Sequence, residues 1–304
     1  MKQILVPLDG SDFAEGALDT AVALAMRDGA SIQLLSVVPT EPPFGFTDEA
    51  MLTGWVDAEK SLQQDYLKKT AASVAARSED LRVEASVHVG NVGATIREVS
   101  DALDVDLVIL TTHGRGAFGR VWLGGTADQL LRSLERPVLL LPPTPAGRKP
   151  FAEEPVRHVL VPLDGSEAAE AALDVLPLLP VSGDVRLTLA SVVEDFAVPT
   201  GYPQHATAAG LVDEERQRMV PYLAAIARRL EQEGLGVPET HVLVADSAAR
   251  GLLRHCRETE VEAIALSTHG RGGVPRLLLG SVADKLIRGA GVPILVNRRP
   301  RTGE

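Results

Sequence analysis

Two short motifs that could bind a phosphorylated ligand each occur twice in the chain. VPLDGS ends an apolar run at residues 6–11 and again at 161–166. A glycine segment, THGRGAFGRVWLGGT at 112–126, returns as THGRGGVPRLLLGS at 268–281. A carboxylate just beyond a buried strand can accept hydrogen bonds from ribose hydroxyls, and a helix N-terminus reached through glycines suits a phosphate. These residue types predict a nucleotide site.

The first glycine segment also contains the dinucleotide pattern G-x-G-x-x-G, as Gly114, Gly116 and Gly119. That fingerprint belongs after the first strand of a unit and opens a helix directly, whereas this one precedes a loop. The second copy has Pro275 where the third glycine should be. We therefore interpret the match as chance, and no P-loop pattern G-x-x-x-x-G-K-[ST] occurs in the chain.

A plain structural explanation exists for each motif. Asp-Gly makes a strand-to-helix turn, the serine caps the next helix, and the glycines form a loop before an ordinary helix start. Asp9 and Asp164 fit this explanation less well, because their position suits a ribose. It also leaves unexplained the spacing of nine residues between Gly114 and Gly124, which recurs between Gly270 and Gly280.

Histidines, the single cysteine and four loop arginines are the other side chains that could react or bind a ligand. His113 and His269 are interpreted as turn-stabilising rather than catalytic, and Cys256 as a small core residue. The histidines and the cysteine show no metal-ligand spacing, so Mg²⁺ would arrive with a triphosphate. Four loop arginines could contact the outer phosphates or be solvated: Arg115, Arg120, Arg271 and Arg276.

The elements that must position these residues follow from the repeat. ILVPLDGSDFAEGALD at 4–19 returns as VLVPLDGSEAAEAALD at 159–174. Short apolar runs alternate with longer helical patterns in each copy, which indicates a parallel sheet covered on both faces. Strands are expected at 3–8, 31–38, 82–89, 106–111, 137–141, 158–163, 185–193, 237–244, 261–267 and 292–296. Helices are expected at 12–28, about 48–77, 93–103 and 126–135, with matching segments in the second copy.

Each copy is therefore predicted to be a complete α/β domain. We expect one domain over 1–143, a linker over 144–156 rich in prolines and charges, and a second domain over 157–299. A doubly wound five-stranded sheet commonly has order 2-1-3-4-5 or 3-2-1-4-5, and its ligand lies at the carboxyl ends of strands where winding reverses. For the second order, this crevice collects the ends of strands 1 and 4, where both motifs occur.

Composition excludes several function classes. The net charge is −11 and no Lys/Arg cluster provides a basic face, so a nucleic-acid partner is not expected. No apolar run reaches the roughly 18 residues of a membrane span, and Met1 leads into KQILVPLDG without a signal-peptide pattern, so no membrane partner is expected. A single cysteine fits a reducing compartment. We expect a cytoplasmic protein.

The joint spacing of the motifs resembles the universal stress protein family in its tandem form. That family has G-x2-G-x9-G-[S/T] after strand 4 and a Pro-x-Asp turn after strand 1, and the resemblance covers essentially all of both copies. It implies strand order 3-2-1-4-5, with ATP in the crevice of members that carry the motif. This sequence departs from the pattern at the first motif glycine, which is Thr111 in one copy and Ser267 in the other.

The resemblance also implies which positions contact the nucleotide, with the valines at the end of the second strand of each domain placed against adenine. In the first domain these are Pro7, Asp9, Val38, Gly114, Gly124, Gly125 and Thr126, with Val37 beside Val38. In the second they are Pro162, Asp164, Val193, Gly270, Gly280, Ser281 and Val282, with Val192 beside Val193. Gly125 occupies the hydroxyl position in the first domain, so the second site is expected to be the stronger.

The function expected from the sequence is an adenine-nucleotide-binding protein with a nucleotide-dependent regulatory or stress role and slow or no hydrolysis. An ATP-hydrolysing or adenylyl-transferring enzyme of related fold, or a scaffold that binds no nucleotide, remains the alternative. Family dimers pair through their last strands, so RPVLLLP (136–142) and GVPILVN (291–297) are the expected contact of an intramolecular pseudo-dimer. Association into a homodimer also remains open.

Overall fold

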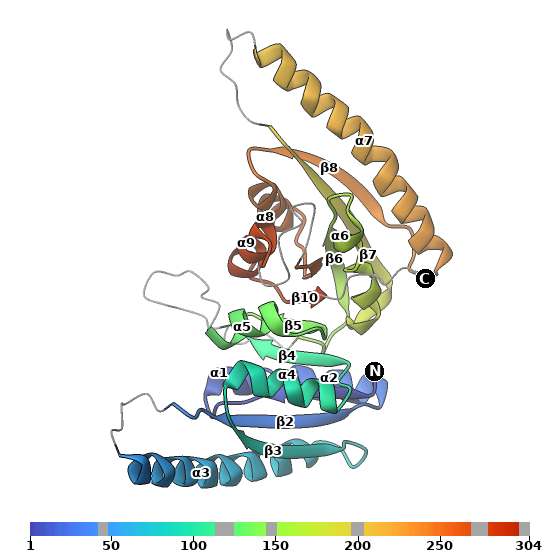
Figure 1. Cartoon of the computed structure of the whole chain (residues 1–304). Coiled ribbons are helices and arrows are strands. Elements are labelled where there is room, and N and C mark those ends of the chain that lie inside the picture. Colours follow the sequence, from blue (N-terminus) through green and yellow to red (C-terminus); the bar gives the residue numbers. More distant parts are fainter. Residues whose placement is uncertain (42–47, 113–124, 144–150, 196–203, 269–278, 298–304) are drawn as a thin grey trace. The chain divides into compact units, whose positions relative to one another are not determined.

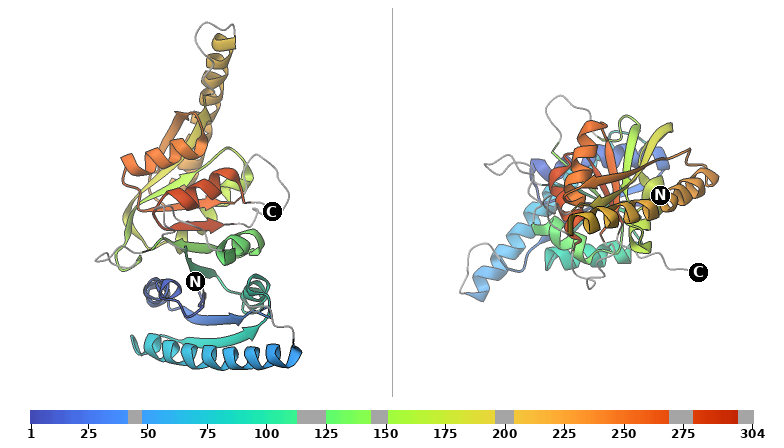
Figure 2. Two further views of the ribbon diagram at one scale, coloured as in Figure 1. Left: turned by 90° about the vertical axis from the view of Figure 1, so that its left-hand side faces the viewer. Right: turned by 90° about the horizontal axis from the view of Figure 1, so that it is seen from above.

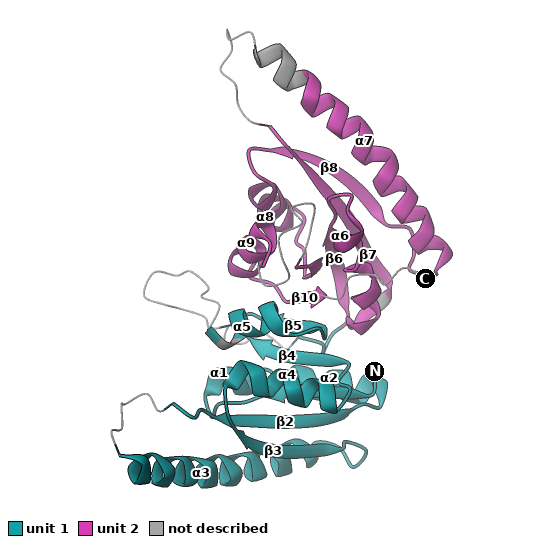
Figure 3. Ribbon diagram, in the orientation of Figure 1, with its two compact units in different colours: residues 1–154 teal, residues 155–304 magenta. Residues whose placement is uncertain are grey.

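A computed structural model of the chain describes residues 1–41, 48–112, 125–143, 151–195, 204–268 and 279–297 (Figure 1, Figure 2). The chain divides into two compact units, residues 1–154 and 155–304 (Figure 3). Each unit holds one copy of the repeat. No helix in the described ranges is both long enough and apolar enough to cross a membrane.

Unit 1 is a five-stranded parallel sheet with helices on both faces. Its strands are β1 (Gln3–Pro7), β2 (Ser31–Val38), β3 (Val83–Val89), β4 (Leu107–Thr111) and β5 (Val138–Leu141). Its helices are α1 (Asp12–Glu15), α2 (Leu18–Asp28), α3 (Glu49–Ala75), α4 (Val92–Ala102) and α5 (Gly125–Ser133). The strand order is β3-β2-β1-β4-β5, with every neighbouring pair parallel. The predicted doubly wound α/β fold is confirmed.

Unit 2 repeats this architecture. Its strands are β6 (Val156–Pro162), β7 (Val181–Glu194), β8 (Glu239–Ala245), β9 (Ala263–Ser267) and β10 (Ile294–Asn297). Its helices are α6 (Glu167–Glu170), the 3₁₀ helix η1 (Leu173–Leu178), α7 (Gln204–Gln232), α8 (Ala248–Glu258) and α9 (Ser281–Gly289). The order β8-β7-β6-β9-β10, again parallel, is the same 3-2-1-4-5 pattern.

The central strands of both sheets are apolar on both faces because helices cover each side. In unit 1, α2 contacts β1 and β2, α3 contacts β2 and β3, and α4 packs against α5. Right-handed crossovers place α2 and α3 on one face and α4 and α5 on the other. All five residues from Ile4 to Leu8 except Pro7 are buried, and Val159, Leu160 and Val161 are buried in the same way in unit 2.

One helix prediction needs correction. The segment matching 12–28 was expected to be a helix in both copies, but after α6 unit 2 has only the six residues of η1. Pro177 lies inside η1 and Pro180 directly precedes β7, and neither can donate an intrahelical hydrogen bond, a loss that the 29-residue helix α7 accommodates at Pro221. The chain turns at Pro180 and begins β7 at Val181, so this strand has 14 residues and starts earlier than the predicted 185–193. In unit 1 the expected helix is also divided, into α1 and α2.

Candidate functional site

The turn after β1 holds Asp9 by local hydrogen bonds. The Ser11 backbone N–H donates to Asp9 Oδ1 at 3.0 Å, and the Ser11 hydroxyl donates to the same oxygen at 2.6 Å. Ser11 Oγ accepts from the Ala14 N–H at 3.2 Å and caps α1. Gly10 has φ +79°, a left-handed conformation that glycine adopts without strain. The carboxylate position is therefore fixed by the fold itself.

The same turn follows β6. Ser166 donates to Asp164 Oδ1 from its N–H at 3.0 Å and from its hydroxyl at 2.6 Å, and its Oγ accepts from the Ala169 N–H at 3.2 Å. Gly165 has φ +83°. Asp9 is exposed, and Asp164 is half-buried. The structural explanation of the serine as a helix cap is correct, and both carboxylates still lie at the carboxyl end of their strand.

The neighbouring strand brings the second motif to the same edge of each sheet. In unit 1, β4 pairs with β1 through Ile4 opposite Leu107. In unit 2, β9 pairs with β6 through Val159 opposite Ala263. Because parallel strands end at one edge, the two motif segments begin at adjacent strand ends. The observed strand order thus agrees with the predicted 3-2-1-4-5 order, in which strands 1 and 4 are neighbours.

The start of α9 is attached directly to the end of β9. The Gly280 N–H donates to the Thr268 carbonyl at 3.0 Å, and a Cβ at Gly280 would lie 3.0 Å from that oxygen. A larger residue would therefore push the helix start away from the strand. Ser281 and Val282 form the first turn, where backbone N–H groups have no partners within the helix. The Ser281 side chain is exposed.

In unit 1 the structure describes the helix start only from Gly125, the counterpart of Ser281. Gly125 begins α5, and a Cβ there would meet nothing within 4 Å. Thr126 belongs to α5, but its side chain lies outside what the structure describes. Gly114, Gly124 and Gly270 also fall outside the described residues, as do His113, His269 and the four loop arginines.

The valines predicted to contact the base lie at or near the ends of the strands next to the aspartate turns. Val38 ends β2 and is 1% exposed, and Val193 in β7 is 4% exposed. Val37 and Val192 are half-buried on the opposite face. Pro7 and Pro162, the last residues of β1 and β6, are half-buried too. These strand ends therefore present backbone groups and apolar surroundings to a ligand, rather than fully exposed valine side chains.

Sequence reasoning missed a repeated pair of side chains beside the turns. The Tyr66 hydroxyl in α3 donates to Glu15 Oε1 at 2.9 Å, and the Tyr222 hydroxyl in α7 donates to Glu170 Oε1 at 3.2 Å. Burial, followed by the adjacent carboxylate, raises the pKa of both tyrosines. Recurrence of the same residue types at nearly the offset of the motifs is a signal that could have identified the pair.

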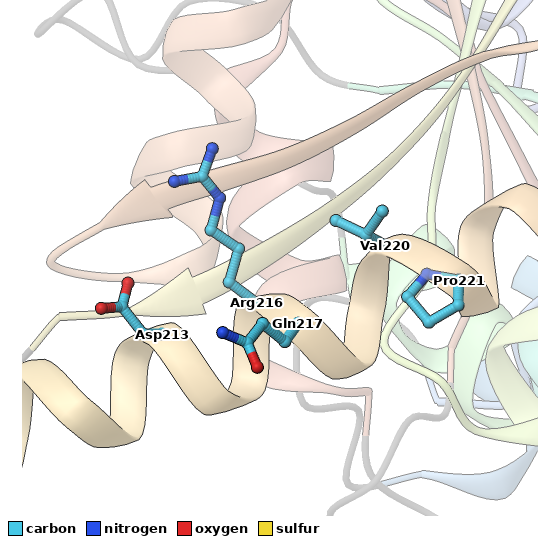
Figure 4. A pocket seen from close by; sticks show the side chains of 5 residues that line it. All are labelled: Asp213, Arg216, Gln217, Val220 and Pro221. Carbon is cyan, nitrogen blue, oxygen red and sulfur yellow. The ribbon is translucent and has the colours of Figure 1, made fainter.

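A separate hollow of about 390 Å³ lies along α7 (Figure 4). Its lining residues are all exposed and come from this one helix: Asp213, Arg216, Gln217, Val220 and Pro221. It does not include any of the predicted site residues. Among the described side chains, no group of three histidines, cysteines or carboxylates could hold a metal ion.

Comparisons with known proteins agree on one family. A model described as the universal stress protein family matches residues 1–142 and 155–298. Universal stress protein Rv1996 of Mycobacterium tuberculosis (strain H37Rv) is 25% identical over 317 residues, which cover 98% of this chain and 95% of that protein. Slr1230 of Synechocystis sp. (strain PCC 6803), another universal stress protein, is 24% identical over 98% of this chain and 100% of its own length.

Solved structures share the fold. A universal stress protein from Archaeoglobus fulgidus superposes with a TM-score of 0.70 at 20% identity, and the match covers 98% of both chains. This likeness extends over both units rather than one copy of the repeat.

Proposed function

The chain belongs to the universal stress protein family, with two tandem domains of that type, and we propose that it binds adenine nucleotides at the strand ends of both domains and transmits occupancy as a regulatory signal. ATP is the proposed ligand. Its binding is expected to change the affinity for a partner in the response to stress. Any hydrolysis is expected to be slow.

The observation that carries the proposal is the duplicated aspartate turn. Both turns hold their carboxylate Oδ1 with the same hydrogen bonds, 2.6 Å and 3.0 Å long, beside the strand that leads to the glycine segment. A helix cap alone needs only the serine, whereas a fixed carboxylate at a switch point suits ribose hydroxyls. Asp9 and Asp164 are therefore proposed to bind ribose, and Val38 and Val193, near the ends of the neighbouring strands, are proposed to contact the base.

The phosphate end of the second site is proposed to lie at the start of α9. A Cβ at Gly280 would lie only 3.0 Å from the Thr268 carbonyl oxygen, so glycine lets the chain pass close to that strand end without crowding it. The first-turn N–H groups of α9 and the Ser281 hydroxyl would then face the phosphates. Mg²⁺ would be carried by the triphosphate itself.

The second site is proposed to bind more tightly than the first. Ser281 supplies a hydroxyl where the first domain has Gly125. Gly114, Gly124, Thr126 and Gly270 remain predicted contacts. The last strands of the two domains remain the predicted contact of the pseudo-dimer.

Mass spectrometry of nucleotides released from protein purified without added ligand tests the proposal, together with calorimetric titration of ATP into nucleotide-stripped protein. We expect recovered adenine nucleotide and two binding events of unequal affinity. Absence of both would refute the proposed function.

A further inference from the structure

Gln63 lies on the face of α3 that covers the aspartate turn of the first domain. Its Oε1 accepts from the Ser36 hydroxyl of β2 at 2.9 Å. A Cβ at Gly10 would lie 4.0 Å from its Nε2, so the amide lies against the turn that carries Asp9. Gln63 is half-buried, while the adjacent Gln64 is exposed.

The orientation of the Gln63 amide is chemically defined. Nε2 donates to Glu59 Oε1 at 3.0 Å, and a carboxylate can only accept. The opposite side of the amide, Oε1, must then face the Ser36 hydroxyl. Nε2 carries a second N–H, for which the described residues supply no partner. The chain therefore holds an oriented donor at this position.

This donor lies next to the proposed base position. Ser36 and Val38 are alternate residues of β2, so their side chains share the face of the sheet that α3 covers. Gly10 directly follows Asp9. The amide is thus flanked by the turn proposed to bind ribose and by the strand end proposed to contact the base.

The second domain has no polar side chain at the matching position. VDAEKSLQQDYL in α3 aligns with VDEERQRMVPYL in α7, which places Met219 opposite Gln63 and Tyr222 opposite Tyr66. The Tyr66–Glu15 and Tyr222–Glu170 hydrogen bonds support this alignment in three dimensions. Met219 is 1% exposed and supplies neither an N–H nor a carbonyl from its side chain.

We propose that Gln63 is a specificity-determining residue, which makes the first-domain site select among purine bases by hydrogen bonding, while the second-domain site, with Met219, selects less sharply. The inference rests on the proposed function. Adenine presents an acceptor at N1 where guanine carries an N–H, so an oriented donor favours ATP over GTP. A site built to form a hydrogen bond discriminates against a base that cannot form it more strongly than packing does.

The test uses the full chain carrying Gly280→Val, so that calorimetry reads the first domain. The ratio of the affinities for ATP and GTP is measured with and without Gln63→Met, which copies the residue of the second domain. Gln64→Met, the same exchange on the neighbouring exposed residue, is the matched control. We expect Gln63→Met to reduce the ratio by about fivefold to tenfold, the worth of one neutral hydrogen bond, and Gln64→Met to leave it unchanged.

Gln63→Glu provides a second variant of the same size, which keeps an oxygen for Ser36 but lacks the N–H. The repulsion between its charge and the triphosphates is common to ATP and GTP and cancels in the ratio. The lost N–H, together with a carboxylate that can accept from the guanine N1–H, should lower the ratio at least as far as Gln63→Met does. A ratio that stays within about twofold in both folded variants, with ATP still bound, overturns the inference and leaves the proposed function standing. Failure of the unmodified chain to bind ATP or GTP overturns both.

Discussion

Gly280 shows how one residue controls the distance between a helix start and a strand end. Its N–H reaches the Thr268 carbonyl at 3.0 Å, and the next intrahelical bond runs from the Asp284 N–H to the Gly280 carbonyl at 2.9 Å. Its φ of −59° is accessible to every residue, so the need for glycine here is steric rather than conformational. The close approach of α9 to the end of β9 thus depends on a missing Cβ.

Gly280→Val is therefore expected to weaken nucleotide binding by the second domain. The side chain would crowd the Thr268 carbonyl and the first turn of α9, and overpacking that costs about 1–3 kcal/mol lowers the affinity by about fivefold to 150-fold. Calorimetry should show loss of the tighter ATP-binding event. Gly183→Val is the control, because a Cβ at Gly183 meets nothing within 4 Å. Equal losses in the two variants would contradict this role of Gly280.

The aspartate turns and Gln63 differ in how far their contacts can be predicted from the sequence. The aspartate turns were predictable because Asp-Gly-Ser makes its hydrogen bonds within three residues of itself. Gln63 was not, because its partner Ser36 lies 27 residues away in another element. The spacing of residues along the chain predicts which side chains share one turn or one helix face. A contact between a helix and a strand depends instead on how the two elements pack.

Among the elements, the short helices α1 and α6 depend on the long helices beside them. Each has only four residues, too few to be stable alone, and each ends at the glutamate that binds a tyrosine of α3 or α7. Glu170 has a second partner, Arg229, whose Nη1 lies 3.1 Å from Oε2. Tertiary hydrogen bonds therefore hold the segments that follow the aspartate turns.

Tyr66→Phe should consequently destabilise unit 1 more than Tyr222→Phe destabilises unit 2. Removal of the Tyr66 hydroxyl takes away the tyrosine hydrogen bond of Glu15, with an expected cost of about 1 kcal/mol in the free energy of unfolding. Glu170 keeps Arg229, so the second change should cost less. Urea unfolding of both variants measures the difference. A larger loss from Tyr222→Phe would show that Arg229 does not support Glu170.

The sequence pattern was sufficient to predict the strands but not the 3₁₀ helix η1. Alternation of apolar runs with amphipathic segments predicted every strand of both sheets, because burial on two faces leaves a clear signal. The 3₁₀ helix η1 was missed because the repeat suggested a copy of α2. Pro177 was visible in the sequence, and its effect on backbone hydrogen bonding should have outweighed the likeness between the copies.

For the whole molecule, duplication of the fold did not duplicate the chemistry of the buried polar groups. Unit 2 buries His158 and His255 in positions where unit 1 has Gln3 and Val99. His158 Nδ1 lies 2.6 Å from Arg186 Nη2, and Nε2 lies 3.0 Å from Thr188 Oγ1. The His255 ring is 5.0 Å from that of His241. Burial of the two rings, with Arg186 beside one and His241 beside the other, therefore disfavours a positive charge on either histidine.

Acid should therefore destabilise unit 2 before unit 1. Burial, and then the Arg186 charge, lowers the pKa of His158; burial, and then His241 and His158, lowers that of His255. The Thr259 carbonyl, which lies 2.9 Å from His158 Nδ1, acts in the opposite direction, as do Glu239, Glu258 and Glu262, but these groups do not reverse the shifts. Since the unfolded chain takes up these protons first, the stability of unit 2 falls as pH drops below the unfolded value of 6.5.

The two tryptophans make this difference measurable, because Trp55 and Trp122 both belong to unit 1. Between pH 7.5 and 5.5, the urea midpoint followed by circular dichroism should fall, while the midpoint followed by tryptophan fluorescence should change little. His158→Gln, which copies Gln3 of unit 1, should reduce the pH dependence of the first midpoint, because one proton-uptake site of the unfolded chain is removed. Equal shifts of both midpoints in the unmodified chain would show that the acid response does not originate in the histidines of unit 2.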